Sequence, residues 1–379
     1  MRDYLMKNKP IRFQFPIDGD CINNNDGTVT ENGIMIQVTV EAPGGHTVEI
    51  CGAPAQFQDG AYRAEVLISD HETFLYAQDK TAGTDCRITV FRLKNPLGGY
   101  RLSSDDNILF LSDITDHKDV YNSIFDNPYL ALYKKAHDLY GAKVHLNLFY
   151  EFDSNHPNFV PGSHKYFNLS MMTDKFREDF QANANWLKFS FHAKADLPDR
   201  PYTNADAPTA LAHMEQVVRE VVRFAGPETL SACTTIHWGS GNKEVVSALR
   251  KQGYRVFAGY FHPTGEPVAY YAPPELVEHV YHRDFWKDTE TDVFFSRIDR
   301  VINIRTLAEN MEVLKQTVAS PTRGGFVSIM IHEQYFHPTY KGYLPDFEKR
   351  VLEACKYLKE RGYQGRLLQE VDDFGNLPV

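Results

Sequence analysis

The 379-residue sequence lacks any long apolar run. Nowhere do about 18 apolar residues follow one another without interruption, so no transmembrane helix is expected. Residues 1–10 are polar and contain no apolar stretch that could act as a signal peptide. The chain also lacks a cluster of Lys or Arg, and its net charge is −10, which argues against nucleic acids and anionic membranes as partners. These absences predict a soluble, cytoplasmic protein.

Cysteine and glycine patterns exclude two further classes of protein. The five cysteines are odd in number, widely spaced and never arranged as C-x-x-C, so we expect reduced core residues and neither a disulfide framework nor a zinc knuckle. No glycine-rich phosphate loop follows an early strand, which argues against an open nucleotide-binding sheet. What remains is an aromatic-rich chain long enough for two domains.

Residues 1–95 are predicted to form a small all-β domain. Short runs of alternating or β-branched residues are separated by turn signals such as Asp59-Gly60, and none has helical periodicity. The expected strands are residues 34–41, 46–50, 61–68, 72–78 and 86–93. This pattern predicts an antiparallel sandwich, and residues 42–50 and 59–66 resemble bacterial immunoglobulin-like modules that accompany carbohydrate-active enzymes.

Residues 96–379 are predicted to form a larger α/β domain, because strand patterns alternate with helical ones. Expected helices span 210–224, 243–252 and 347–361, and the last two end at Gly253 and Gly362. The expected strands are 108–111, 144–150, 187–191, 233–236, 255–260, 301–304, 325–331 and 366–369. Seven or eight such units favour a distorted (β/α)7–8 barrel. Residues 151–168 and 262–292 are expected to be loops that carry the functional site.

Polar residues stand beside several of these strands. Reacting groups in a βα-barrel come from the C-terminal ends of the strands, so the residues there are the candidates. They are Asp105 and Asp106 beside the first strand, His192 and Asp196 after the third, His237 and Trp238 after the fourth, and His332 and Glu333 at the seventh. Adjacent carboxylates repel each other unless a cation lies between them, which points to a divalent metal site.

The candidate residues resemble the motifs of the polysaccharide deacetylases of the NodB-like superfamily. That family has two Asp at its first strand, a His-x-x-x-His motif after the third and a late Leu-x-x-His motif. The matching residues are Asp105 and Asp106, His192, and His332. Asp196 stands where the family has its second His, and His237 stands where its third motif begins with Arg. His237 is therefore an alternative source of the missing nitrogen ligand.

The resemblance implies a metal-dependent carbohydrate deacetylase with zinc as the expected ion. Asp106 and His192 would hold the ion, and His237 or Asp196 would complete the set. The resemblance further implies that Asp105 takes a proton from water and that His332, across the substrate from it, protonates the leaving amine.

Three aromatic or acidic residues near these motifs have open roles. Glu333 is expected to point to the opposite side of its strand and to be structural. Trp238 and Trp286 are candidates to stack on a sugar face, with ordinary packing as the alternative.

Two other functions stay open from the sequence. The first is a metal-free glycosidase that uses two carboxylates, Asp105 with either Glu333 or Asp284, which requires a separation of about 5 to 9.5 Å. The second is a carbohydrate-binding protein on a barrel that has lost its activity. Bound metal would favour the deacetylase, and a metal-free cluster of hydrogen-bonded side chains would favour the binding protein.

Overall fold

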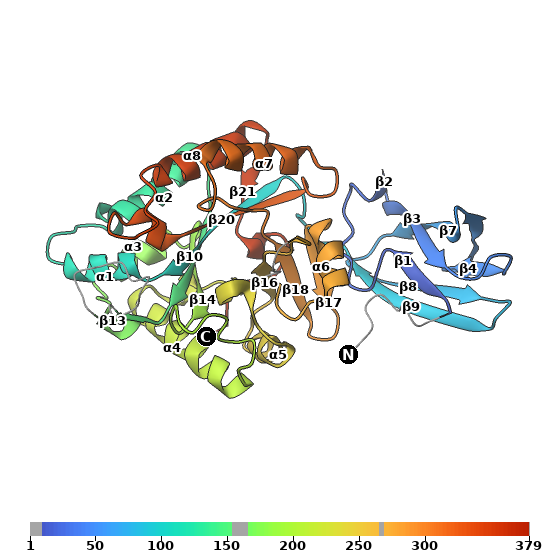
Figure 1. Ribbon diagram of the computed structural model, residues 1–379, viewed down its shortest axis with the longest axis horizontal. Helices are drawn as coiled ribbons and strands as arrows, with labels where there is room; N and C mark the ends of the chain where they lie inside the picture. Colours follow the sequence, from blue (N-terminus) through green and yellow to red (C-terminus); the bar gives the residue numbers. More distant parts are fainter. Residues whose placement is uncertain (1–9, 154–165, 265–268, 379) are drawn as a thin grey trace.

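The computed structural model describes residues 10–153, 166–264 and 269–378. Antiparallel strands make up the part up to Phe91, and a mixed α/β part begins at Gly99 (Figure 1). No helix in the described ranges is long and apolar enough to span a membrane.

The first part consists of two antiparallel sheets with a common apolar core. One sheet has the order β1-β3-β7-β6, with β2 paired to β3, and the other has the order β5-β4-β8-β9. The bounds are β1 (Arg12–Phe15), β2 (Gly27–Thr30), β3 (Gly33–Glu41), β4 (Val48–Ile50), β5 (Ala53–Pro54), β6 (Gln56–Gln58), β7 (Ala61–Ile68), β8 (Glu72–Asp79) and β9 (Thr84–Phe91). The alternating apolar residues of β3 are buried in this core, as their period of two predicts. An immunoglobulin-like connectivity stays a prediction.

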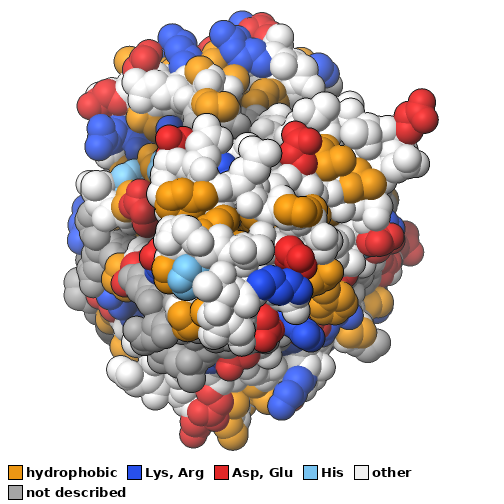
Figure 2. All heavy atoms as spheres, turned by 90° about the vertical axis from the view of Figure 1, so that its right-hand side faces the viewer, with side chains coloured by type: hydrophobic (Ala, Val, Ile, Leu, Met, Phe, Trp, Pro, Cys, Tyr) orange, Lys and Arg blue, Asp and Glu red, His pale blue; other side chains and the backbone are white. Residues whose placement is uncertain are grey.

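The outer end of these sheets carries charges of both signs. Figure 2 shows separate apolar patches there, set among acidic and basic side chains. Both signs are therefore interspersed on this face.

The second part is built on parallel strands. The first sheet has the order β14-β11-β10-β20-β19, with β21 paired to β10, and every pair in it is parallel. Its strands are β10 (Gly99–Asn107), β11 (Val144–Phe149), β14 (Leu187–Ala193), β19 (Arg300–Val301), β20 (Phe326–His332) and β21 (Gln364–Gly365). The second sheet has the order β15-β16-β18-β17 and contains β15 (Cys233–Thr234), β16 (Val256–Gly259), β17 (Phe285–Asp288) and β18 (Val293–Arg297). A hairpin of β12 (Glu151–Asp153) and β13 (Tyr166–Asn168) stands apart.

One backbone hydrogen bond connects β14 of the first sheet to the segment before β15 of the second, and another extends the pairing of β19 with β20 toward β18. The amide of Ser231 donates to the carbonyl of Phe189 at 3.0 Å, and the amide of Asp299 donates to the carbonyl of Ser328 at 2.8 Å. The parallel strands therefore follow one another in chain order, as the predicted α/β class requires. A complete barrel stays a prediction.

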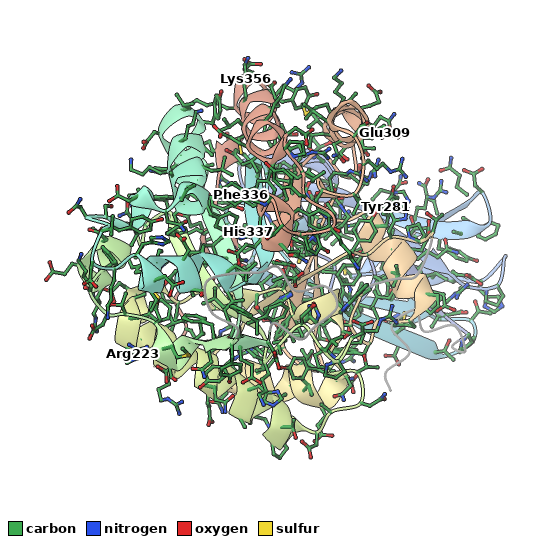
Figure 3. The ribbon with its side chains drawn as sticks, turned by 60° about the vertical axis from the view of Figure 1, so that its left-hand side comes forward. Arg223, Tyr281, Glu309, Phe336, His337 and Lys356 are labelled. Atoms are coloured by element: carbon green, nitrogen blue, oxygen red, sulfur yellow. The ribbon has the colours of Figure 1, made fainter. Side chains whose placement is uncertain are left out.

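Helices cover the outside of the parallel strands (Figure 1). They are α1 (Leu109–Asp116), α2 (Pro128–Tyr140), α3 (Arg177–Ala182), α4 (Ala207–Phe224), α5 (Lys243–Lys251), α6 (Pro274–Tyr281), α7 (Leu307–Ala319) and α8 (Phe347–Glu360). Figure 3 shows Glu309 and Lys356 on the outer surface of α7 and α8. The three helices expected from the sequence are confirmed as α4, α5 and α8, and Gly253 and Gly362 have the positive φ expected after a helix.

Several expected assignments are wrong, including the strand expected at residues 366–369, where a 3-10 turn spans Leu368–Glu370. Residues 108–111 were expected to be the first parallel strand, but β10 ends at Asn107 and α1 begins at Leu109. The helix begins there because a distant carboxylate, that of Glu333, accepts its first backbone N–H groups. Residues 262–292, expected to be a loop, contain α6 and β17.

A short segment of the first part joins it to the second. Trp286 on β17 is fully buried, donates its indole N–H to the carbonyl of Asp18 at 2.8 Å, and stacks on Phe295. The prediction that Trp286 stacks on a sugar is therefore wrong, because the sandwich covers its ring. Beside it, the buried carboxylate of Asp20 contacts His279.

Replacing Asp20 by Asn is expected to reduce the free energy of unfolding by about 2 kcal/mol at pH 7. Burial alone would raise the pKa of Asp20, but the charges of His279 and Arg283 lower it by more. This stabilisation is present above the unfolded pKa of about 3.9 and is lost as the pH falls through the lower folded value. Urea unfolding should therefore show the difference at pH 7 and little of it near pH 2. Asp138→Asn, in an exposed helical pair, is the control; an equal loss there would contradict the prediction.

Candidate functional site

The C-terminal ends of three parallel strands of the first sheet bring the predicted residues together. Asp105 and Asp106 lie at the end of β10, His192 lies at the end of β14, and His332 ends β20. His237 follows β15 in a short 3-10 turn, His237–Gly239. Because these strands run in the same direction, their ends meet on one side of the sheet, as the sequence predicted.

These strand ends open into a cavity of about 680 Å³. Polar residues from the strand ends form its floor, and aromatic and aliphatic side chains form its walls. The lining includes Asp105, Asp106, His192, His237 and His332, with Phe149, Trp238, Tyr260, Tyr335 and Tyr340 among the walls. A cavity of this size, with a few convergent polar groups, is typical of a small-molecule site.

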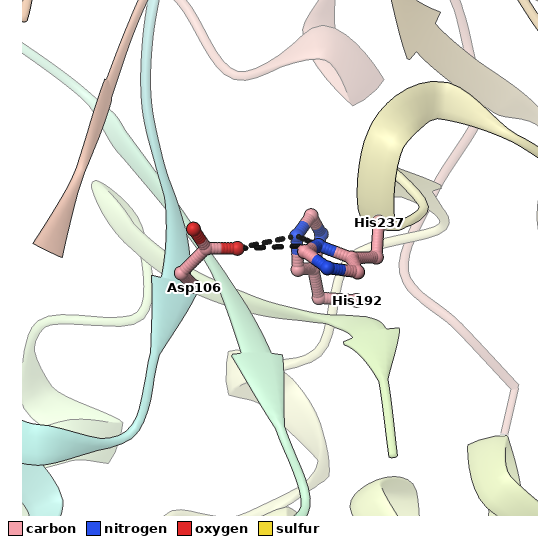
Figure 4. A group of neighbouring side chains, drawn as sticks. All are labelled: Asp106, His192 and His237. Carbon is pink, nitrogen blue, oxygen red and sulfur yellow. Dashed lines mark hydrogen bonds and ion pairs between the residues drawn. The ribbon is translucent and has the colours of Figure 1, made fainter. Parts of the chain in front are cut away.

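Three buried side chains form a tight triangle on the cavity floor (Figure 4). Oδ1 of Asp106 lies 3.1 Å from Nε2 of His192 and 3.3 Å from Nδ1 of His237. The two imidazole nitrogens lie 3.1 Å from each other. One oxygen and two nitrogens therefore converge on a common point.

The outer nitrogens of both rings face backbone carbonyl groups. Nδ1 of His192 donates to the carbonyl of Thr235, and Nε2 of His237 donates to the carbonyl of Asp196 at 3.0 Å. A carbonyl oxygen only accepts, so each ring carries its proton on the outer nitrogen. In the neutral tautomers, both inner nitrogens then present lone pairs to the Asp106 carboxylate.

This donor set fits a divalent metal ion. Three electron-rich atoms within 4.8 Å of one another repel unless a cation lies between them. Outer N–H groups that donate to backbone carbonyls orient imidazole ligands in known metal sites. Two imidazoles and one carboxylate, with a position left open, are the ligands of catalytic zinc.

The same contacts explain the charges of the triangle. Burial would raise the pKa of Asp106, but when the rings of His192 and His237 are also protonated on their inner nitrogens, their hydrogen bonds to the carboxylate hold its pKa well below its usual range. Burial would lower the pKa of His192, but its hydrogen bond to Asp106 and the nearby carboxylate charges raise it. Asp106 is therefore ionised and available as a ligand.

Asp106 adopts a backbone conformation that is uncommon for residues other than glycine. Its φ is +61°, in the left-handed region. Oδ2 of Asp106 accepts a hydrogen bond from Nε2 of Gln334 at 2.7 Å. Backbone strain held in place by such contacts is found mostly at functional sites. Sequence reasoning missed Gln334, although it lies two residues after His332.

Asp105 lies outside the triangle but on the same cavity. It is 2% exposed, and its Oδ1 accepts a hydrogen bond from Nδ2 of Asn147 at 2.6 Å. The sequence analysis missed Asn147. The signal was present, because an amide in the middle of an apolar strand that is buried on both faces needs a partner.

His332 is oriented by another residue that the sequence analysis missed. Oδ1 of Asn303 accepts from the backbone amide of His332 at 3.2 Å and from its Nδ1 at 3.0 Å. Nε2 of His332 is thereby left for the cavity. Asp105 and His332 are register partners on the adjacent strands β10 and β20. Their placement on opposite sides of a bound substrate stays a prediction.

The remaining candidates fall into different places. Asp196 lines the cavity, but its carboxylate oxygen is 3.7 Å from Nε2 of His237 and is not part of the triangle, so its predicted role as a ligand is not supported by the geometry. Trp238 lines the cavity with 44% of its surface exposed, and its φ is +59°. It is therefore placed where a ligand could stack on it.

Glu333 has the structural role that the sequence predicted. It is fully buried, and its carboxylate accepts backbone N–H bonds from Ile108, Leu109 and Phe110 at 2.7, 2.9 and 2.6 Å. These groups begin α1, whose positive end favours a carboxylate. Glu333 thus holds the chain in place directly after Asp105 and Asp106.

The glycosidase alternative loses both of its proposed carboxylate pairs. Glu333 is used by the start of α1, and neither it nor Asp284 lines the cavity. Asp284 is buried 3.1 Å from Arg297, and burial raises its pKa to about 7. Glycosidic cleavage through Asp105 with either residue is therefore excluded by position.

Replacing Glu333 by Gln is expected to reduce the free energy of unfolding by about 3 kcal/mol, because a charged acceptor for three buried N–H groups is lost. Chemical denaturation at pH 7 would measure this. Glu348→Gln, an exposed change at the start of α8, serves as the control with an expected loss below about 1 kcal/mol. Equal losses for the two variants would contradict the assigned role.

Comparisons with known proteins find only remote likenesses. No protein-family model matches the chain, and no curated protein matches it. A 4-alpha-glucanotransferase from Thermococcus litoralis is 10% identical with a TM-score of 0.45; the match covers 73% of this chain and only 40% of that one. A CE4-family pseudoenzyme from Bacillus anthracis is 9% identical with a TM-score of 0.32 over 79% of this chain and 83% of that one. A mutant pseudoenzyme of the same family, with restored enzymatic activity, is 11% identical with a TM-score of 0.31, and the match covers 77% of this chain and 78% of that one. At these identities and TM-scores, no activity is assigned from any of them.

Proposed function

We propose that this protein is a metal-dependent carbohydrate deacetylase, which hydrolyses an N- or O-acetyl group on a sugar. The observation that carries the proposal is the triangle of Asp106, His192 and His237 on the floor of a cavity that Asp105 and His332 also line. Of these residues, Asp105, Asp106, His192 and His332 match the deacetylase motifs in chain order. His237, placed where the family has Arg, supplies the nitrogen that Asp196 does not.

A divalent ion in the triangle, with zinc as the expected metal, supplies Lewis acidity that polarises the acetyl carbonyl and makes water more acidic. The chain's own residues do the rest. Asn147 holds one oxygen of Asp105 and leaves the other to take a proton from the attacking water. Asn303 holds Nδ1 of His332, so that Nε2, once protonated, can deliver its proton to the leaving group. Trp238 would stack on the sugar.

Elemental analysis and an activity panel test this proposal together. Protein purified without added metal should contain about one divalent ion per chain and should hydrolyse at least one of a panel of N- and O-acetylated sugars. Metal without hydrolysis on any substrate would contradict the catalytic proposal and leave the carbohydrate-binding alternative. Absence of both metal and hydrolysis would contradict the metal site as well.

A further inference from the structure

The charged residues around the cavity indicate which kind of substrate fits there, which the triangle of Asp106, His192 and His237 does not. Five aspartates line the cavity, and none of the lining residues in the described ranges is a lysine or an arginine. The carboxylates are Asp105, Asp106, Asp153, Asp196 and Asp199. Their five negative charges exceed the two of a divalent ion together with those of two nearby guanidinium groups, Arg101, whose charge acts on Asp105, and Arg200, which lies over the ring of Trp238. The cavity is therefore negative even with metal bound.

This field disfavours anionic substrates. A carboxylate, sulfate or phosphate on the substrate would meet like charges and find no cationic side chain among the described lining residues. The phenol groups of the walls do not compensate. Burial raises the pKa of Tyr340, so that its hydroxyl group stays neutral.

The same walls suit an ammonium group. Aromatic faces attract cations, most strongly when carboxylates stand beside them, and here Trp238, Tyr260, Tyr335 and Tyr340 line the same cavity as the aspartates. The indole of Trp238 already takes a cation, since the guanidinium of Arg200 lies 5.7 Å from its ring centroid. Asp199, which directly precedes Arg200 in the sequence, is exposed and lines the same cavity.

We propose that the preferred substrate carries a primary ammonium group close to the acetyl group that is removed. This inference rests on the proposed function and narrows it. The source of the ammonium group is either a partly deacetylated amino-sugar oligomer or an acetylated polyamine, and both present the same chemistry. Deacetylation releases acetate, an anion that the negative cavity would repel, so the field also favours product release.

Four acetylated compounds, matched as closely as possible, test the inference. They are a disaccharide of N-acetylglucosamine with glucosamine, its neutral diacetylated form, an analogue with a uronic acid in place of glucosamine, and an acetylated polyamine. We expect kcat/KM for the ammonium-bearing sugar to exceed that of the neutral form by about tenfold at low ionic strength, and the uronic acid to be the poorest. In about 1 M NaCl the ratio should approach one. The compound with the larger kcat/KM, either the amino sugar or the polyamine, identifies the source of the ammonium group.

A pair of charge-matched variants locates the effect. Asp199→Asn should reduce the ratio of ammonium-bearing to neutral substrate severalfold, while Asp85→Asn, an equal charge change on β9 of the first part, should leave the ratio as in the parent protein. Asp199 is exposed, so the variant is expected to fold, and circular dichroism checks this.

The outcomes separate this inference from the proposed function. Hydrolysis of all three sugars without regard to charge, or an equal effect of the two variants, would overturn the inference and leave the deacetylase standing. Tighter calorimetric binding of the ammonium-bearing compounds to metal-loaded protein, with no hydrolysis of any, would support the inference and overturn the deacetylase. Equal binding of anionic and cationic compounds without hydrolysis would overturn both.

Discussion

Replacing Asp105 by Asn is expected to reduce turnover by about 10² to 10⁴-fold while the metal content stays near that of the parent protein. Asp105 lies outside the triangle of Asp106, His192 and His237, so its loss removes no ligand. Asn is of the same size and can keep a contact with Asn147, but it cannot accept a proton from water. The expected effect therefore falls on kcat and not on folding.

His332→Ala is expected to reduce turnover by a similar factor for a different reason. In the proposed mechanism, Nε2 of His332 donates a proton to the leaving group. An amine needs that proton to leave, whereas the alcohol of an activated ester leaves more easily without it. For substrates with good leaving groups, His332→Ala should therefore reduce turnover less than Asp105→Asn does. This difference separates the acid from the base.

Asp85→Asn is the control for these two variants, because it changes an exposed residue on β9 that does not line the cavity. Metal content by elemental analysis and kcat with a single substrate are measured side by side for all the proteins. Turnover equal to that of the parent in both cavity variants would remove the assigned catalytic roles. Loss of metal in Asp105→Asn would instead make Asp105 a ligand.

Replacing His237 by Ala is expected to abolish stoichiometric metal binding, with an affinity loss of more than about 100-fold. Residues that only support metal ligands are already worth about 10 to 100-fold, so a ligand is expected to be worth more. The removal of His237 is also the most informative test of the ligand set, because the sequence left open whether His237 or Asp196 completes that set. Asp196→Asn should retain most of the metal.

Thermal unfolding gives a second measure of the same prediction. Metal that binds only the folded protein stabilises it by about 2.7 kcal/mol at a free concentration of 100 Kd. A chelator should therefore lower the Tm of the parent protein and leave the Tm of His237→Ala unchanged. His282→Ala, at an exposed position after α6, is the control and should respond to the chelator as the parent does. If the chelator leaves the Tm of the parent protein unchanged, that result would contradict the metal site.

Local sequence patterns predicted those strands and helices whose buried residues recur with the period of the element itself. Strand β7 has the predicted bounds, and α5 and α8 end before the glycines that mark their C-termini. A hydrophobic pattern with a period of two or 3.6 residues indicates which side of a strand or helix is buried, and a glycine after a helix indicates a positive φ. Both signals lie within a few residues of the element that they describe.

The sequence by itself also determined much of the candidate site. His192 and His332 could be singled out because parallel strands in chain order bring their C-terminal ends together, whatever the details of packing. Asp105 and Asp106 were singled out by their resemblance to the first deacetylase motif, because the strand expected at residues 108–111 began after them. Only the tertiary structure decided three further points. These are the choice of the third ligand, the partner residues Asn147, Asn303 and Gln334, and the burial of Trp286. Each depends on a contact between residues far apart in the chain. The start of α1 is the clearest case, since the carboxylate that accepts its first N–H groups, Glu333, lies 225 residues away from Ile108. No local pattern around Ile108 records that contact, because the free energy that begins the helix there comes from a different strand.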